Sequence, residues 1–111
     1  QKQSGEEVAV KTYNLKNMTA SQQRELHREI SIQCSMSHPN IAKIKEVYMD
    51  EGTVRLILEY LRGGTLLERL HEQGPFCEAK AAQATLQLLS AIEHVHSQHF
   101  MHRDVKPENV V

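Results

Sequence analysis

The sequence predicts an α+β fold in which short strands are combined with amphipathic helices. Apolar residues alternate over residues 8–13 and dominate residues 53–61, as expected of strands. They recur every three or four residues over 19–36 and 78–98, as expected of helices. With 111 residues, of which 40% are hydrophobic, the chain can bury one compact core.

The first strand is expected at Val8–Tyr13, where even- and odd-numbered side chains point to opposite faces. A helix then begins at Thr19 or Ser21, either of which can cap its first turn, and runs to about Met36. The apolar stripe of this helix repeats every four residues, at Leu26, Ile30 and Cys34. The segment His38-Pro39-Asn40 ends the helix, because the residue before a proline disfavours helical backbone.

Two further strands, Ile44–Met49 and Thr53–Leu61, are expected on either side of a short hairpin loop at residues 50–52. The second of these strands is very apolar, which favours a place in the centre of the sheet. Gly63 and Gly64 break it.

Two helices and a loop complete the chain. Thr65 can cap a short helix that ends at Gly74, and a long helix is expected over Glu78–Gln98. The residues expected on the buried side of the long helix are Ala81, Thr85, Leu88, Leu89, Ile92 and Val95. Residues 100–111 have no helical period and contain Pro107, so we expect an extended loop there.

Composition excludes several classes of partner. The 13 Lys and Arg residues are balanced by 14 Asp and Glu, which argues against a nucleic-acid or anionic-membrane surface. The most apolar stretch, residues 54–61, contains Arg55 and Glu59 and is far shorter than the roughly 20 residues that span a bilayer. The two cysteines lack the spacing of a zinc or redox motif, so we expect a reducing compartment and a cytoplasmic protein.

Chemistry-bearing side chains gather between residues 102 and 109. Asp104, Lys106 and Asn109 lie on one irregular segment, and a loop can direct all three toward a common point. A carboxylate can accept a hydroxyl proton, an ammonium can neutralise phosphate charge, and an amide oxygen can bind a hard cation such as Mg²⁺. Phosphoryl transfer uses all three.

The segment resembles the catalytic loop of the eukaryotic protein kinases, which reads His-Arg-Asp, four residues, then Asn. The resemblance implies that Asp104 is the catalytic base, Asn109 a magnesium ligand and Lys106 a contact to the transferred phosphate. Lys106 is also typical of the serine/threonine-specific class. His102 and Arg103 are expected to support the loop.

Residues 8–11, Val-Ala-Val-Lys, resemble the Val-Ala-Ile-Lys strand of the same family. The resemblance implies that Ala9 packs on adenine and Lys11 binds the α- and β-phosphates of ATP. Taken alone, this tetrapeptide would indicate an edge strand with a surface lysine. The catalytic-loop motif in the same chain favours the nucleotide-binding interpretation instead.

The family pairs this lysine with a carboxylate on the following helix, and Glu25 and Glu29 both qualify because they are four residues apart on one helical face. Residues 38–41, His-Pro-Asn-Ile, resemble the loop after that helix. Counting back from this loop places Glu29 at the pairing position.

Residues 56–64 resemble the strand and hinge that join the two kinase lobes. The resemblance implies that Leu58 is the gatekeeper and that the backbone of Glu59 and Leu61 hydrogen-bonds adenine. A buried strand followed by a turn would have the same local structure. Thr65 stands where many members have an acidic ribose ligand, and we leave it out of the site because a hydroxyl binds ribose more weakly.

The resemblance implies a partial, two-lobed protein kinase domain over residues 1–111, with a small-lobe portion at 1–58, a hinge at 59–64 and the start of the large lobe at 65–111. It implies ATP and Mg²⁺ as cofactors and protein substrates with a Ser or Thr acceptor. Residues 91–102 are similar to the group that includes the calcium/calmodulin-dependent kinases. The substrate, the activator and any regulatory partner are not predicted.

Neither a Gly-rich loop before Val8 nor an Asp-Phe-Gly motif after Asn109 is present, so we expect the isolated chain not to catalyse. A pseudokinase or interaction module on the same fold is the alternative function. The intact motif residues Lys11, Glu29, Asp104 and Asn109 argue against it. A more remote alternative is a metal-binding domain, because four histidines cluster at His94, His96, His99 and His102.

Overall fold

A computed structural model describes residues 5–101 and 105–111, and its contacts divide the chain into two compact units. In the described part, the first unit holds residues 5–37 and 41–60, and the second holds residues 38–40, 61–101 and 105–111. Each unit is described by itself below. Residues 102–104, which belong to the predicted catalytic loop, lie outside the described residues.

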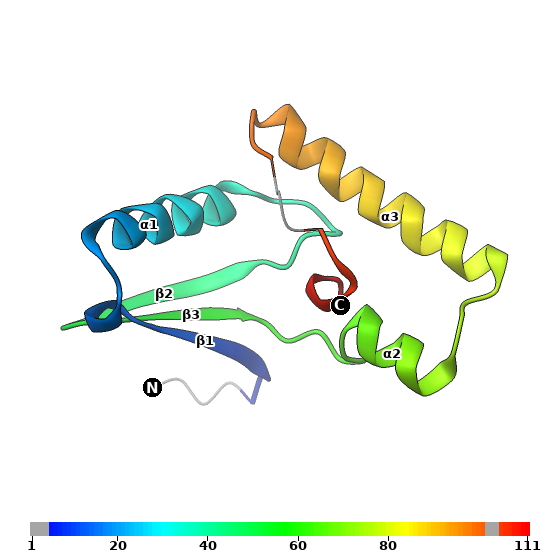
Figure 1. The fold of residues 1–111 in the computed structure, drawn as a ribbon, viewed down its shortest axis with the longest axis horizontal. Helices are drawn as coiled ribbons and strands as arrows, with labels where there is room; N and C mark the ends of the chain where they lie inside the picture. Colours follow the sequence, from blue (N-terminus) through cyan, green and yellow to red (C-terminus); the bar gives the residue numbers. More distant parts are fainter. Residues whose placement is uncertain (1–4, 102–104) are drawn as a thin grey trace. The chain divides into compact units, whose positions relative to one another are not determined.

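The first unit contains a three-stranded antiparallel sheet made of β1 (Val8–Asn14), β2 (Ile44–Asp50) and β3 (Thr53–Glu59), shown in Figure 1. The strand order is β1-β3-β2, so the prediction that the most apolar strand is central is confirmed. The prediction that this strand continues to Leu61 is wrong, since β3 ends at Glu59.

The end of β3 has a physical cause. The Glu59 N–H donates to the Lys43 carbonyl at 3.1 Å, and the Glu59 carboxylate accepts from the Lys43 N–H at 2.7 Å. Both bonds join Glu59 to Lys43, the residue just before β2. The β3 ladder therefore ends where its neighbour β2 begins. The chain then enters Gly63 and Gly64, whose φ angles of 118° and 70° do not belong to a strand.

Helix α1 (Ala20–Ser35) covers one face of the sheet, and its start and end match the prediction. Thr19 is the N-cap: its hydroxyl accepts from the Gln22 N–H at 3.2 Å, and the Gln22 side chain accepts from the Thr19 N–H at 2.8 Å. This capping box satisfies two backbone donors that the first turn leaves without helical partners. A short 3₁₀ turn, η1 (Leu15–Asn17), joins β1 to the helix.

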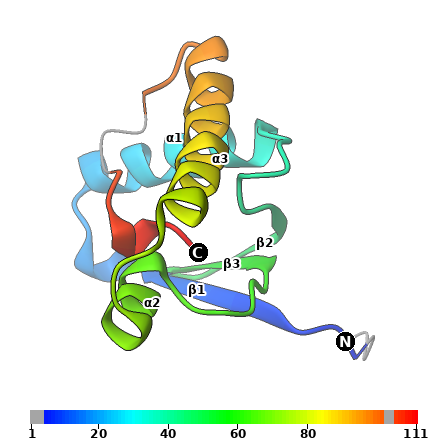
Figure 2. The same cartoon turned by 90° about the vertical axis from the view of Figure 1, so that its right-hand side faces the viewer.

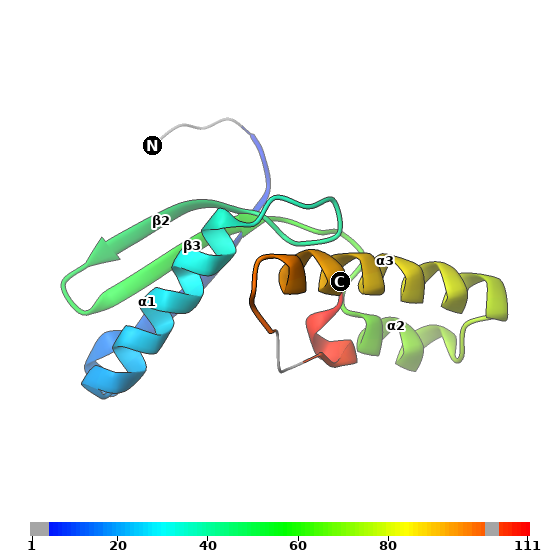
Figure 3. The same cartoon turned by 90° about the horizontal axis from the view of Figure 1, so that it is seen from above.

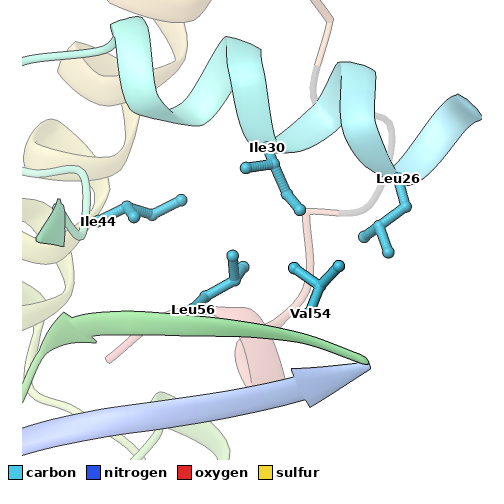
Figure 4. Packing of buried hydrophobic residues seen from close by; sticks show 5 residues of the cluster. All are labelled: Leu26, Ile30, Ile44, Val54 and Leu56. Carbon is cyan, nitrogen blue, oxygen red and sulfur yellow. The ribbon is translucent and has the colours of Figure 1, made fainter. Parts of the chain in front are cut away.

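The core of the first unit lies between α1 and the sheet (Figure 4), and is formed by Leu26, Ile30, Ile44, Val54 and Leu56. The Val54 side chain, on the central strand, is fully buried. The prediction that Cys34 continues the apolar stripe of α1 is wrong, because its thiol is exposed. Each four-residue step rotates about 40° past a full turn, so two steps from Leu26 carry Cys34 about 80° away from the sheet-facing side.

The second unit contains α2 (Leu66–Gln73) and α3 (Glu78–Ser97), which Figure 3 shows from above. Both helices lie within one residue of the predicted bounds. The prediction that residues 100–111 form only an extended loop is wrong, because the 3₁₀ turn η2 spans Pro107–Asn109. Pro107 occupies its first position, where a fixed φ and a missing N–H suit a helical turn.

Helix α3 is partly covered in the described chain. Ala91 is buried, whereas Leu89 and Leu86 are 57% and 70% exposed. The prediction that Thr85 and Leu89 lie on the buried side is wrong, since both are exposed. About 200° of helical rotation separates Leu89 from Ala91, which places Leu89 on the opposite side of the helix. Across the described residues, no helix is long and apolar enough to cross a membrane.

Candidate active site

The register of β1 against β3 shows on which face of the sheet the two β1 residues predicted to bind nucleotide lie. Ala9 is paired with Leu58 and Lys11 with Leu56. Directly paired residues of an antiparallel sheet project from the same face, and Leu56 points into the core beneath α1 (Figure 4). Ala9 and Lys11 therefore lie on the α1 side of the sheet, as a lysine that pairs with a carboxylate of that helix requires.

The Lys11 ammonium lies over the Tyr13 ring, 5.1 Å from the ring centroid, which is within the range of a cation–π contact. Tyr13 is paired with Val54 of β3 and lies on the same sheet face as Lys11. Within residues 5–101 and 105–111 no ion pair joins Lys11 to Glu29. Their pairing therefore stays a prediction.

Glu25 and Glu29 are both exposed on α1. Each directly precedes a residue of the buried stripe, Leu26 and Ile30 respectively, so the two carboxylates flank that stripe on the same side. Their positions on the helix do not distinguish them. The choice of Glu29 depends on the resemblance alone.

The residues predicted to contact adenine lie at the end of β3 or shortly after it. Leu58 is half-buried between Ala9 of β1 and Ile44 of β2, and packs against the core of the first unit. Glu59 has its N–H and its carboxylate bonded to Lys43, as described above, so its side chain is used structurally. Leu61 belongs to the second unit and is 39% exposed.

In the second unit, Lys106 and Asn109 lie in one turn. Lys106 precedes η2 as its N-cap residue, and its carbonyl accepts from the Asn109 N–H at 2.9 Å. Both residues are exposed. Asp104, the predicted base, lies outside the described residues, so its placement beside Lys106 and Asn109 stays a prediction.

The turn that carries Asn109 is connected to α2. The Leu66 N–H, at the start of α2, donates to the Val110 carbonyl at 2.7 Å. Thr65 caps the same helix in a capping box with Glu68: the Glu68 carboxylate accepts from the Thr65 N–H at 2.6 Å, and the Thr65 hydroxyl accepts from the Glu68 N–H at 3.2 Å. These bonds, first from the Thr65 backbone and then from its hydroxyl, lower the pKa of the Glu68 carboxyl.

Glu68 was not singled out by sequence reasoning, although its signal is present. Residues 65–68 read Thr-Leu-Leu-Glu, which is the capping-box pattern of a hydroxyl residue followed by Glu three positions later. The long-range bond from Leu66 to Val110 has no such local signal.

Two histidines of the second unit, His38 and His94, have side-chain contacts. His38 Nε2 lies 3.2 Å from the Ser90 hydroxyl, and its Nδ1 accepts from the Asn40 N–H at 3.0 Å. The His38 and His94 ring centroids are 5.1 Å apart. In the part of the chain that the structure describes, no group of three or more His, Cys, Asp or Glu residues could hold a metal ion.

Comparisons with known proteins agree with these motifs. The family model of the protein kinase domain matches residues 1–111. An Aurora kinase of Dictyostelium discoideum is 42% identical over 89 residues, covering 80% of this chain and 23% of that protein. Human calcium/calmodulin-dependent protein kinase type IV is 38% identical over 102 residues, covering 91% of this chain and 22% of that protein.

A solved structure is similar as well. The crystal structure of Rad53 1-466 in complex with AMP-PNP matches with a TM-score of 0.80 and 29% identity, covering 92% of this chain and 26% of that one. The chain thus spans about a quarter of the length of these relatives. Its α+β fold is part of the two-lobed kinase fold, and the chain belongs to the protein kinase domain family.

Proposed function

We propose that this chain is the nucleotide-lysine and catalytic-loop portion of a serine/threonine protein kinase, which in its complete domain transfers the γ-phosphate of ATP to Ser or Thr hydroxyls. The observation that carries the proposal is the family match over the whole chain together with the register that puts Ala9 and Lys11 on the α1 side of the sheet. Named serine/threonine kinases among the relatives support the acceptor class, one being mouse serine/threonine-protein kinase DCLK3.

The catalytic-loop residues have separate roles in this proposal. Asp104 accepts the proton of the acceptor hydroxyl, and Lys106 compensates charge on the transferred phosphate. The amide oxygen of Asn109 is a hard donor of the kind that Mg²⁺ prefers, so its chemistry fits a magnesium ligand. When bound, the ion neutralises charge on the ATP phosphates.

Residues of the first unit and the hinge bind the nucleotide in this proposal. Ala9 and Leu58, which are cross-strand neighbours, contact the adenine ring, while the backbone of Glu59 and Leu61 hydrogen-bonds its edge. Lys11 binds the α- and β-phosphates, and Glu29 orients its ammonium. The AMP-PNP in the similar Rad53 structure supports a nucleotide ligand for this fold.

The remaining parts of the proposal concern the whole protein. Its substrates are proteins with a Ser or Thr acceptor, and it acts in the cytoplasm. Residues 1–58, 59–64 and 65–111 form the small-lobe portion, the hinge and the start of the large lobe. Sequence similarity to calcium/calmodulin-dependent protein kinase type IV supports placing the protein in the group that includes the calcium/calmodulin-dependent kinases.

A nucleotide titration tests the proposal. We expect the chain to bind a fluorescent ATP analogue in the presence of Mg²⁺, and Lys11→Met to weaken that binding at least about tenfold, since charge-assisted bonds to phosphate are worth about 1.5–3 kcal/mol. Lys80→Met is the matched control, because it removes the same charge from an exposed position on α3.

Equal loss of affinity in the Lys11 and Lys80 variants would contradict a specific phosphate contact. Absence of nucleotide binding by a folded chain would favour the pseudokinase or interaction-module alternative. Folding of each variant is checked by circular dichroism before the titration.

A further inference from the structure

The first turn of α2 (Leu66–Gln73) uses its backbone donors in two different ways. The first N–H groups of a helix have no partners within the helix. Thr65 and Glu68 satisfy two of these donors reciprocally in their capping box. The Leu66 N–H is satisfied from outside the helix, by the Val110 carbonyl at 2.7 Å.

The Leu66–Val110 bond connects α2 to the segment proposed to bind metal and phosphate. Val110 directly follows Asn109, whose N–H closes the η2 turn on the Lys106 carbonyl. Helix α2 and η2 are also in packing contact, and Figure 2 shows the two segments side by side. The turn that carries Lys106 and Asn109 is therefore held against the first turn of α2.

The two residues just before α2, Gly64 and Thr65, accommodate the Glu68 carboxylate of the capping box. Gly64 has a φ of 70°, and a Cβ there would lie 2.7 Å from the Glu68 carboxylate oxygen Oε2. Glycine at this position therefore leaves room for the carboxylate that accepts from Thr65. The Thr65 hydroxyl itself accepts from the Glu68 N–H and lies 3.0 Å from the same carboxylate oxygen, so its hydrogen bonds are directed into the helix.

On the basis of the function proposed above, we propose that Thr65 is a positioning residue of the catalytic loop. By capping α2, Thr65 fixes the direction of the Leu66 N–H, and this N–H holds Val110 and with it Asn109. Thr65 thus has a role that differs from the ribose contact made by an acidic residue at this position in the family. Its action on Asn109 passes through one backbone hydrogen bond.

The test is nuclear magnetic resonance of the full chain without nucleotide, comparing amide exchange at Leu66 with the signals of Val110 and the Asn109 side-chain amide. Thr65→Ala should speed Leu66 exchange about fivefold or more, as expected for a lost N-cap, and should shift the Val110 and Asn109 signals. Thr65→Ser and Thr65→Asp, which retain a capping oxygen, should restore the wild-type exchange rate and signals.

Thr19→Ala is the matched control, because Thr19 forms the same type of capping box with Gln22 at the start of α1, in the other unit. It should destabilise the first unit and leave the Leu66, Val110 and Asn109 signals unchanged. If Thr65→Ala fails to fold, Glu68→Ala removes the acceptor of the Thr65 N–H and should give the same shifts.

The proposal is overturned if Thr65→Ala speeds Leu66 exchange while the Asn109 signals stay at their wild-type positions, because the cap would then be purely structural. It is also overturned if neither Ser nor Asp restores the signals. Since no nucleotide is present, these outcomes do not depend on whether the chain binds ATP.

Discussion

At the scale of single residues, backbone conformation and side-chain capping define the start of α2. Gly64 has a positive φ and directly precedes the N-cap Thr65, and the Glu68 carboxylate occupies the space beside its Cα. Gly63 also has a positive φ, but a Cβ there would have no neighbour within 4 Å. The two glycines therefore differ in what a side chain would disturb.

We expect Gly64→Ala to destabilise the fold by about 1–2 kcal/mol through left-handed backbone strain, and also to displace the Glu68 carboxylate. Gly63→Ala is the control, since it adds strain without contact to Glu68. Chemical denaturation measures the stability of both variants, and the Glu68 carboxyl pKa, followed by magnetic resonance, should return toward its ordinary value in Gly64→Ala only. An unchanged Glu68 pKa in that variant would refute the proposed crowding.

At the scale of elements, the sequence predicts the helix caps but does not predict which side of each helix is buried. Thr65 caps α2 as predicted, and Thr19, one of the two predicted candidates, caps α1, because a cap depends on residues within four positions of each other. The exposure of Cys34 and Leu89 was mispredicted, because burial depends on which other segments of the chain reach that side of the helix.

Acid should weaken the first turn of α2. The pKa of the Glu68 carboxyl is lowered from 4.5 by the Thr65 backbone N–H and hydroxyl, so the folded state favours the ionised form. The stabilisation is present above the unfolded-state pKa and is lost as pH falls through the lower folded-state value. Protection of the Leu66 amide, measured as its exchange rate relative to the intrinsic rate of an unstructured amide at the same pH, should therefore fall below about pH 4.5. Glu68→Gln keeps an acceptor that does not titrate, and a similar loss of protection in acid in that variant would disprove the role of Glu68.

At the scale of the whole molecule, the two units carry different parts of the proposed chemistry. The first unit holds Lys11 and Ala9 on the core-facing side of its sheet, and the second holds Lys106 and Asn109 in one turn. Related kinases are about four times as long as this chain, which has no Asp-Phe-Gly motif in its 111 residues.

We expect the purified 111-residue chain to show no phosphoryl transfer, because the metal-binding Asp of the Asp-Phe-Gly motif must be in place for catalysis. The measurement is incorporation of labelled phosphate from ATP into a generic Ser/Thr substrate in the presence of Mg²⁺. The Asp104→Asn variant sets the background, and activity clearly above that background would show the expectation to be wrong.

The sequence by itself determined the local structure and the family. Caps, helix bounds and the motif around Asn109 depend on residues close together in the chain, whose backbone donors and side chains meet with little help from the rest of the fold. Only the tertiary structure decided that Lys11 lies opposite Leu56 and that the Leu66 N–H holds Val110. The two residues of each pair are separated by more than 40 residues of sequence. Sheet register and packing bring them together, because no local sequence preference can act over that separation.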